Sequence, residues 1–185
     1  MDMTILNFLQ QFTHPILDAF FVFLTRIGDY GELWIFICLL FMLKKNTRRA
    51  GFLGIVALII EAILVMVVLK PMFDRPRPYI VNDFPIVIPT PSGSSFPSGH
   101  TAASFAVAFI LYFNRVPCRK TILFLSGLMS YSRLYLYVHY PSDILFGVFI
   151  ALLIAILLRI YQDNIISFTK KILQNIRSLF SKKLA

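Results

Sequence analysis

The chain has 185 residues, of which 58% are hydrophobic and 15% are charged, and its mean hydropathy is +0.76. A soluble domain is about 45–50% apolar and about 25% charged, so this composition excludes an ordinary soluble protein and a disordered chain. The net charge of +9 is compatible with nucleic-acid binding, but excess Lys and Arg also marks the cytoplasmic side of membrane proteins. The positions of the charges therefore decide between these two interpretations.

Six apolar segments predict six transmembrane helices. A hydrocarbon core about 30 Å thick requires about 20 helical residues at about 1.5 Å per residue. The clearest segment is 52–69, which is interrupted only by Glu61, whereas 15–24 and 33–43 need their flanking residues to cross. We therefore expect an all-α, polytopic membrane helix bundle with six antiparallel transmembrane helices, formed by residues 15–24, 33–43, 52–69, 101–113, 121–138 and 143–158.

The basic residues are unevenly divided between the two sides of the predicted bundle. Of the 18 Lys and Arg residues, 13 lie in the connections 44–49 and 115–120 or beyond residue 158, which share one side. By the positive-inside rule this side is cytoplasmic, and six crossings place both termini there. The charge thus indicates a lipid bilayer as partner and no nucleic acid. Five basic residues remain on the outer side: Arg26, Lys70, Arg75, Arg77 and Arg133.

Both ends of the chain have amphipathic helical patterns. Apolar residues at helical spacing in 1–13 predict either an interfacial helix or a lead-in to the first crossing. Residues 162–185 combine an apolar face with Lys and Arg, which is typical of a helix on an anionic leaflet. A solvated, partly disordered tail is the alternative. We therefore divide the chain into a membrane domain, 1–161, and a basic amphipathic cytoplasmic tail, 162–185.

Cations and a helix start gather at the outer ends of the predicted helices. Ionisable residues near hydrocarbon are costly and usually functional. Segment 97–100 opens a predicted helix, whose free first-turn N–H groups attract anions. Gly99 lets the backbone approach a ligand closely, and the Ser98 hydroxyl adds a donor. Lys and Arg neutralise phosphate, so these features together predict a phosphate site. Its cations are Lys70, Arg77 and Arg133.

Two histidines and a carboxylate lie at the same depth. A neutral imidazole can attack phosphorus if a neighbour fixes its tautomer, and Asp143 follows His139 by four residues. A second imidazole, His100, can then protonate the leaving oxygen. Residue chemistry alone leaves open which histidine attacks, although the following Asp favours His139. No cluster of carboxylates is available for magnesium, so we expect no metal ion and no other cofactor.

The order of these residues resembles the three-part signature of the type 2 phosphatidic acid phosphatase superfamily, which includes membrane lipid phosphate phosphatases. The resemblance implies metal-independent hydrolysis through a phosphohistidine, with His139 as the nucleophile, Asp143 orienting it and His100 as the acid. It also implies phosphoryl contacts from Lys70, Arg77, Ser98, Gly99 and Arg133. The matching motifs are Lys70-x6-Arg77-Pro78, Pro97-Ser98-Gly99-His100 and Ser132-Arg133-x5-His139-x3-Asp143.

A site at the outer membrane surface favours a lipid phosphate as substrate. Small bacterial members of the resembling family are similar in size and commonly act on undecaprenyl diphosphate, which regenerates the carrier for cell-wall synthesis. Phosphatidylglycerophosphate and phosphatidic acid are the alternatives, since the motifs do not separate them. A non-enzymatic anion-binding transporter or scaffold is a further alternative, which needs no nucleophile. The long outer connection 79–96 is a candidate lid that governs selectivity.

Two other ionisable residues receive a purely structural interpretation. Arg75 lies between signature positions, where a contact with substrate is the alternative, but we expect it in a solvated loop. Glu61 lies in the middle of an apolar segment, where we expect its carboxyl group to bond a hydroxyl inside the bundle rather than to relay protons. Neither residue enters the predicted site.

Overall fold

The computed structural model describes residues 1–183, with side chains described for 1–172 and 174–176, and every regular element in this range is helical. The predicted all-α class is therefore confirmed. In chain order the elements are α1 (Asp2–Leu9), η1 (Gln10–Phe12), α2 (Pro15–Ile27), η2 (Asp29–Gly31), α3 (Glu32–Leu43), α4 (Arg48–Ala62), η3 (Ile63–Leu69), α5 (Lys70–Phe73), α6 (Pro78–Val81), α7 (Gly99–Phe113), α8 (Arg119–Tyr135) and α9 (Pro141–Lys183).

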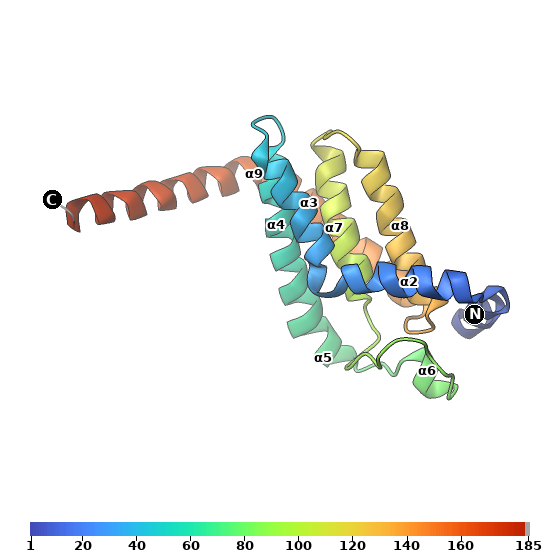
Figure 1. Ribbon diagram of the computed structural model, residues 1–185. Coiled ribbons are helices and arrows are strands. Elements are labelled where there is room, and N and C mark those ends of the chain that lie inside the picture. Colours follow the sequence, from blue (N-terminus) through green and yellow to red (C-terminus); the bar gives the residue numbers. More distant parts are fainter. Residues whose placement is uncertain (184–185) are drawn as a thin grey trace.

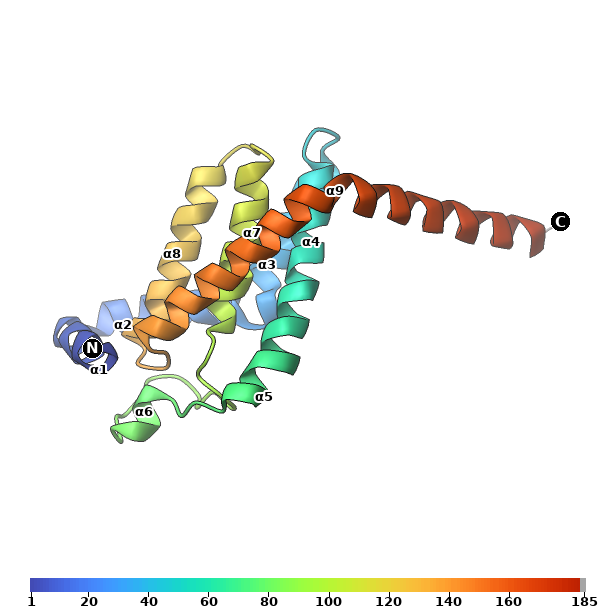
Figure 2. The same ribbon diagram turned by 180° about the vertical axis from the view of Figure 1, so that it is seen from behind.

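Helix α7 forms the centre of the bundle, where it packs against α4, α8 and α9 (Figures 1 and 2). The side chains at these contacts are small, and Ala102, Ala106, Ala151 and Ala155 are completely buried. Small residues let helix backbones approach closely, which favours helix association in lipid, where burying apolar side chains gains little. This packing fixes the start of α7 beside the start of α9, at what we call the site end of the bundle.

Residues 48–81 and 141–176 are long and apolar enough to cross a membrane, although residues 74–77 interrupt the helix in the first of these stretches, and α7 is a shorter apolar helix. Helix α8 has 17 residues and α3 has 12, which correspond to about 26 Å and about 18 Å of helix. These helices run alongside α4 and α7 in Figure 1. That all five of these segments cross the membrane stays a prediction.

Helix α2 does not form the first of the six predicted crossings. His14 N and the Asp18 carboxylate both bond the Tyr135 hydroxyl, at 3.1 and 2.6 Å. Near the other end of α2, the Thr25 hydroxyl accepts a hydrogen bond from Arg133. Because both ends of α2 contact the last turn of α8, the helix lies across the site end instead of spanning the bundle, as Figure 1 shows. The predicted transmembrane helix at 15–24 is therefore wrong.

The physical reason is that α2 is two-sided, because length alone does not separate its 13 residues from the 12 of α3. Phe21 and Leu24 are buried against the bundle, whereas Ile16 and Phe23 are exposed. A helix with this composition is stable in the plane of the interface, where its polar groups find partners. Apolar content alone does not distinguish this placement from a crossing.

The N-terminus also lies at the site end, because Asp2 forms an ion pair with Arg75 and a hydrogen bond with Ser142 N. Helix α9 starts at the site end and reaches the opposite end, where Asp163 pairs with Arg49 at 2.6 Å. The prediction that both termini share one side is therefore wrong. The uneven distribution of charge is unaffected by this correction, because residues 1–13 contain no Lys or Arg.

Helix α9 continues without interruption from Pro141 to Lys183, through the predicted boundary at residue 161. Its second half extends away from the other helices in Figure 2 and exposes Phe168, Ile172 and Ile176. An interfacial role for this half stays a prediction. Residues 184–185 of the predicted tail lie outside the described residues.

Candidate functional site

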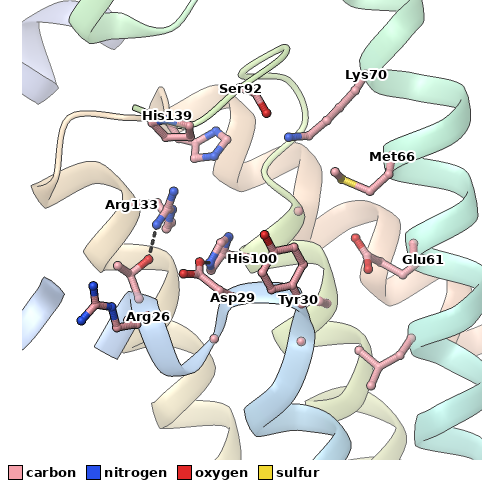
Figure 3. A pocket seen from close by; sticks show the side chains of 18 of the residues that line it. Arg26, Asp29, Tyr30, Glu61, Met66, Lys70, Ser92, His100, Arg133 and His139 are labelled. Carbon is pink, nitrogen blue, oxygen red and sulfur yellow. Dashed lines mark hydrogen bonds and ion pairs between the residues drawn. The ribbon is translucent and has the colours of Figure 1, made fainter. Parts of the chain in front are cut away.

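A cavity of about 890 Å³ opens among the helix ends at the site end (Figure 3). Its polar part is lined by six of the eight predicted site residues, which come from α5, the following loop, α7, α8 and the segment after α8. These residues are Lys70, Arg77, Gly99, His100, Arg133 and His139. The two others, Ser98 and Asp143, are completely buried next to the cavity but do not line it.

His139 is the only one of the two signature histidines that lies beside the signature carboxylate. Its Nδ1 is 3.4 Å from Asp143 Oδ2, and its Nε2 is 3.4 Å from an Arg77 Nη1. The pairing is local, because Pro141 starts α9 and places Asp143 in the first turn, where its Oδ2 also accepts from Tyr140 N at 2.9 Å. One imidazole nitrogen thus faces a carboxylate and the other faces a cation on the cavity side.

The surroundings of His139 favour its neutral form. Burial, followed by the charges of Arg133, Arg77 and Lys70, holds the pKa of this imidazole well below its usual value. The side chain is 2% exposed, so water does not screen these effects effectively. A neutral imidazole with Nδ1 directed at a carboxylate has its lone pair on Nε2, which is the form required of a nucleophile.

Arg77 is held in place by backbone carbonyls. Its guanidinium donates to Gly93 O, Ser92 O and Val138 O, each at 3.1 Å. The segment before α7 therefore wraps around this side chain, which is only 3% exposed. A guanidinium fixed in this way can bind an anion with little further loss of side-chain entropy.

Arg133 and Lys70 approach the cavity from opposite sides (Figure 3). Arg133 lies in the last turn of α8, and its Nε has no hydrogen-bond partner among the described residues. A buried donor of this kind is costly unless a ligand satisfies it. Lys70 follows η3, a π-helical stretch of the kind often found at functional sites, and its side chain extends toward His139 in Figure 3.

His100 has a partner that sequence reasoning missed. Its Nε2 is 3.0 Å from Asp29 Oδ1, and Asp29 also lines the cavity. The hydrogen bond from His100 lowers the pKa of Asp29 below its usual value. Tyr30 and Gly31 follow with positive φ angles of 55° and 75°, which form the turn that presents Asp29. Nothing in the sequence relates Asp29 to a histidine 71 residues later.

Arg75 is a second missed residue, and its expected place in a solvated loop is wrong. One guanidinium nitrogen lies 2.6 Å from Asp143 Oδ1 and 2.8 Å from Ser142 Oγ. Another lies 3.0 Å from Asp2 Oδ2, and the guanidinium stacks on the Tyr140 ring at 3.8 Å. Arg75 therefore occupies the side of the Asp143 carboxylate that faces away from His139.

Ser98 and Glu61 complete the surroundings. Ser98 precedes α7, accepts from Thr101 Oγ1 at 3.1 Å and donates its backbone N–H to Asp143 O at 3.2 Å. Glu61 is 4% exposed and lines the cavity, and its Oε1 has no partner among the described residues, so that oxygen lacks the expected hydroxyl bond. No group of three His, Cys, Asp or Glu side chains in the described part of the chain could hold a metal ion.

The site thus combines a neutral histidine, its carboxylate and three cations at the end of a bundle of apolar helices, which defines a phosphate-handling membrane protein. Residues 50–167, more than half of the chain, match the model of the PAP2 superfamily. The chain belongs to this family and is a membrane lipid phosphate phosphatase. The resemblance of its motifs to the type 2 phosphatidic acid phosphatases is thereby confirmed.

Several relatives have named activities. The undecaprenyl-diphosphatase BcrC of Bacillus subtilis is 24% identical over 91% of this chain and 87% of that protein. An undecaprenyl-diphosphatase of Sulfolobus acidocaldarius is 34% identical over 71% of this chain and 64% of that protein. The crystal structure of a transmembrane PAP2 type phosphatidylglycerolphosphate phosphatase from Bacillus subtilis superposes with a TM-score of 0.72 and 26% identity, covering 89% of this chain and 85% of that one.

Proposed function

We propose that this phosphatase hydrolyses undecaprenyl diphosphate to undecaprenyl phosphate and phosphate at the outer face of the membrane, through a phosphohistidine. The observation that carries the proposal is the position of His139, whose Nε2 faces the cavity cations while Nδ1 faces Asp143. A protein that only bound anions would need the cations but no such nucleophile.

In the proposed reaction, His139 Nε2 attacks the terminal phosphorus and the bond from phosphorus to the bridging oxygen breaks. His100 donates a proton to that oxygen, so undecaprenyl phosphate leaves. His100 then accepts a proton from water, which attacks the phosphohistidine, releases phosphate and restores His139. Throughout both steps, Asp143 stabilises the positive charge that develops on the His139 ring.

The phosphoryl oxygens bear the charge of the transition state, and the cavity offers cations and backbone donors to stabilise it. Lys70, Arg77 and Arg133 line the same polar part, and Gly99 is at the N-terminus of α7, where the backbone N–H groups are free. We include Ser98 in this set as predicted, although its hydroxyl lies just behind the lining residues. Side-chain cations thus take the place that magnesium occupies in other phosphoryl-transfer sites.

The apolar part of the cavity supports a long isoprenoid chain as the lipid. It descends from the cations between α2, α3 and α4, where an extended hydrocarbon can lie. Its walls are built from aliphatic side chains, including Val22, Ile35, Ile55, Leu58, Ile59 and Met66. Two undecaprenyl-diphosphatases among the relatives favour the same substrate. The outer location rests on the basic connections, which lie at the end opposite the cavity.

Phosphatidylglycerophosphate is the second candidate substrate, because the Bacillus subtilis protein of similar structure is a phosphatidylglycerolphosphate phosphatase. Phosphate release from undecaprenyl diphosphate, phosphatidylglycerophosphate and phosphatidic acid, measured in detergent with EDTA, separates the candidates. We expect the highest kcat/KM for undecaprenyl diphosphate and a loss of at least about a thousandfold in His139→Ala. The control is His14→Asn, which keeps an N-cap acceptor for Ile16 N at a position that does not line the cavity.

Each alternative has its own outcome in this assay. Preferential hydrolysis of phosphatidylglycerophosphate or phosphatidic acid would overturn the proposal that undecaprenyl diphosphate is the substrate. Undiminished hydrolysis by His139→Ala would overturn the proposal that His139 is the nucleophile. Binding of these lipids without turnover by the wild type would favour the non-enzymatic transporter or scaffold.

A further inference from the structure

Helix α1 is attached along one face to the segment that carries the nucleophile, residues 135–143, which we call the His139 segment. Asp2 bonds Ser142 at both its backbone N–H and its hydroxyl. One turn later Leu6 is completely buried in a cluster with tyrosines of the same segment. Asn7 Oδ1 accepts a hydrogen bond from the Tyr137 hydroxyl at 2.5 Å. Just beyond α1, Gln10 Nε2 donates to the backbone carbonyl of Tyr135 at 3.0 Å. Positions 2, 6 and 10 repeat at helical spacing, so one face makes these contacts.

The other face of α1 is apolar and exposed. Ile5 and Phe8 in α1 and Phe12 in η1 are 44%, 56% and 55% exposed, and α1 lies next to the start of α2 in Figure 1. An amphipathic helix of this kind lies in the membrane interface with its apolar face in the lipid. Helix α1 therefore has lipid on one side and the His139 segment on the other.

A chain of charges connects α1 to the nucleophile. Asp143 uses Oδ2 for His139 Nδ1 and Tyr140 N, and Oδ1 for Arg75 at 2.6 Å. This division of its two oxygens fixes the rotation of the carboxylate and keeps Oδ2 directed at the imidazole. Arg75 in turn is held by Asp2 at 3.0 Å and by stacking on Tyr140.

Asp2 is ionised for this role. Burial opposes the charge, but hydrogen bonds from Ser142 and Arg75 outweigh it and lower the pKa of the Asp2 carboxyl group. The carboxylates of Asp2 and Asp143, which come from distant parts of the chain, thus share the Arg75 guanidinium, and neither carboxylate lines the cavity. Asp2 also lies outside residues 50–167, which match the family model, so the family motifs do not include it.

We propose that Arg75 and Asp2 are positioning residues for the Asp143–His139 pair, and that α1 is an interfacial clamp that holds the His139 segment in its reactive geometry. The inference rests on the proposed role of His139. Because Asp2 and Arg75 act through Asp143 and do not contact the substrate, their loss slows the chemical step without weakening substrate binding.

The test compares Asp2→Asn, Arg75→Gln and the double variant with the wild type in detergent, on any lipid phosphate that the wild type hydrolyses. We expect kcat to fall about three- to tenfold in Asp2→Asn and about 10–100-fold in Arg75→Gln, with KM changed less than about twofold. In the Arg75→Gln background, Asp2→Asn adds little, since its partner is already absent. Asp2→Glu restores part of the rate.

Asp74→Asn is the matched control, since Asp74 is the exposed neighbour of Arg75 and Asn tolerates its positive φ of 37°. Its kcat should equal that of the wild type. A purely structural role for α1 would lower the melting temperature and leave kcat of the folded protein unchanged. That result, or independent multiplicative losses in the double variant, would overturn the proposal.

Hydrogen exchange gives a readout that does not depend on turnover. Asp2→Asn should accelerate amide exchange in residues 135–143 and leave the loop 114–118, at the opposite end, unchanged. Unchanged exchange in 135–143 would contradict the clamp even if no substrate were hydrolysed. Failure of the wild type to form a phosphohistidine, with the exchange result as expected, would instead contradict the proposed function alone.

Discussion

Gly147 lies in α9 where this helix crosses the start of α7, and replacing it tests whether the two halves of the site depend on close helix packing. A Cβ added at Gly147 would lie 3.0 Å from the Ser98 carbonyl oxygen and 3.2 Å from Thr101 Cβ. Ordinary contacts to a Cβ begin at about 3.4 Å, so the helices must separate by a few tenths of an ångström. The separation moves Gly99 and His100 away from His139.

The expected magnitude follows from this displacement. Alanine gains about 1 kcal/mol in helix propensity over glycine, and overpacking costs about 1–3 kcal/mol, so the net loss of stability in Gly147→Ala is about 0–2 kcal/mol. A misplacement of about 1 Å costs about a hundredfold in rate, so a few tenths of an ångström should lower kcat about four- to tenfold.

The assay is phosphate release in detergent, with thermal unfolding measured on the same samples. The control is Gly127→Ala in α8, where an added Cβ meets no atom within 4 Å. This variant should keep the wild-type kcat and gain up to about 1 kcal/mol in stability. A wild-type kcat in Gly147→Ala would refute the argument that helix contact at Gly147 sets the geometry of the site.

Four further predictions concern the cavity and His139. Asp29→Asn removes the charge that supports protonated His100, so the phosphatase should lose about 10–100-fold in kcat, and an unchanged kcat would exclude Asp29 from the reaction. Ile88→Ser changes a cavity wall and should alter the preference between undecaprenyl diphosphate and phosphatidic acid, whereas Val87→Ser, at an exposed position outside the cavity, should not; equal profiles would exclude this part of the 79–96 segment as a selectivity lid. In the proposed reaction His139 attacks as the neutral imidazole, and its pKa lies well below the usual value, so kcat/KM should show no acid limb near pH 6.5 that belongs to this residue. The same depressed pKa means that the unfolded state binds the proton first, so stability should fall as the pH drops below about 6.5, as unfolding at several pH values would show.

The cavity lining was predictable because its residues stand in motifs with fixed spacing. Asp143 follows His139 by only four residues, and the helix that starts at Pro141 places its first-turn carboxylate beside the imidazole. Gly99 and His100 open a helix for the same local reason. Lys70 and Arg133 were predictable as site residues because charge beside lipid is costly, so a cation at the end of an apolar helix usually has a function.

The partners that orient these residues were not predictable, because they come from distant parts of the chain. Asp29 lies 71 residues before His100, and Asp2 lies 73 residues before Arg75. No periodicity links such pairs, and each residue alone is typical of a loop or a helix start. The prediction of a crossing at α2 was wrong for the same reason. Hydrogen bonds to Tyr135 and Arg133 hold this helix across the site end, and its apolar content does not indicate them.

In the proposed mechanism, a lipid diphosphate covalently phosphorylates His139. Purified protein is mixed in EDTA with undecaprenyl diphosphate that carries a radiolabelled terminal phosphate, the reaction is stopped in alkali, and the labelled peptide is mapped. We expect transient label on His139, none in His139→Ala, and normal labelling in His14→Asn. Label on His100 or another side chain, or steady turnover in which no labelled protein forms, would contradict this mechanism.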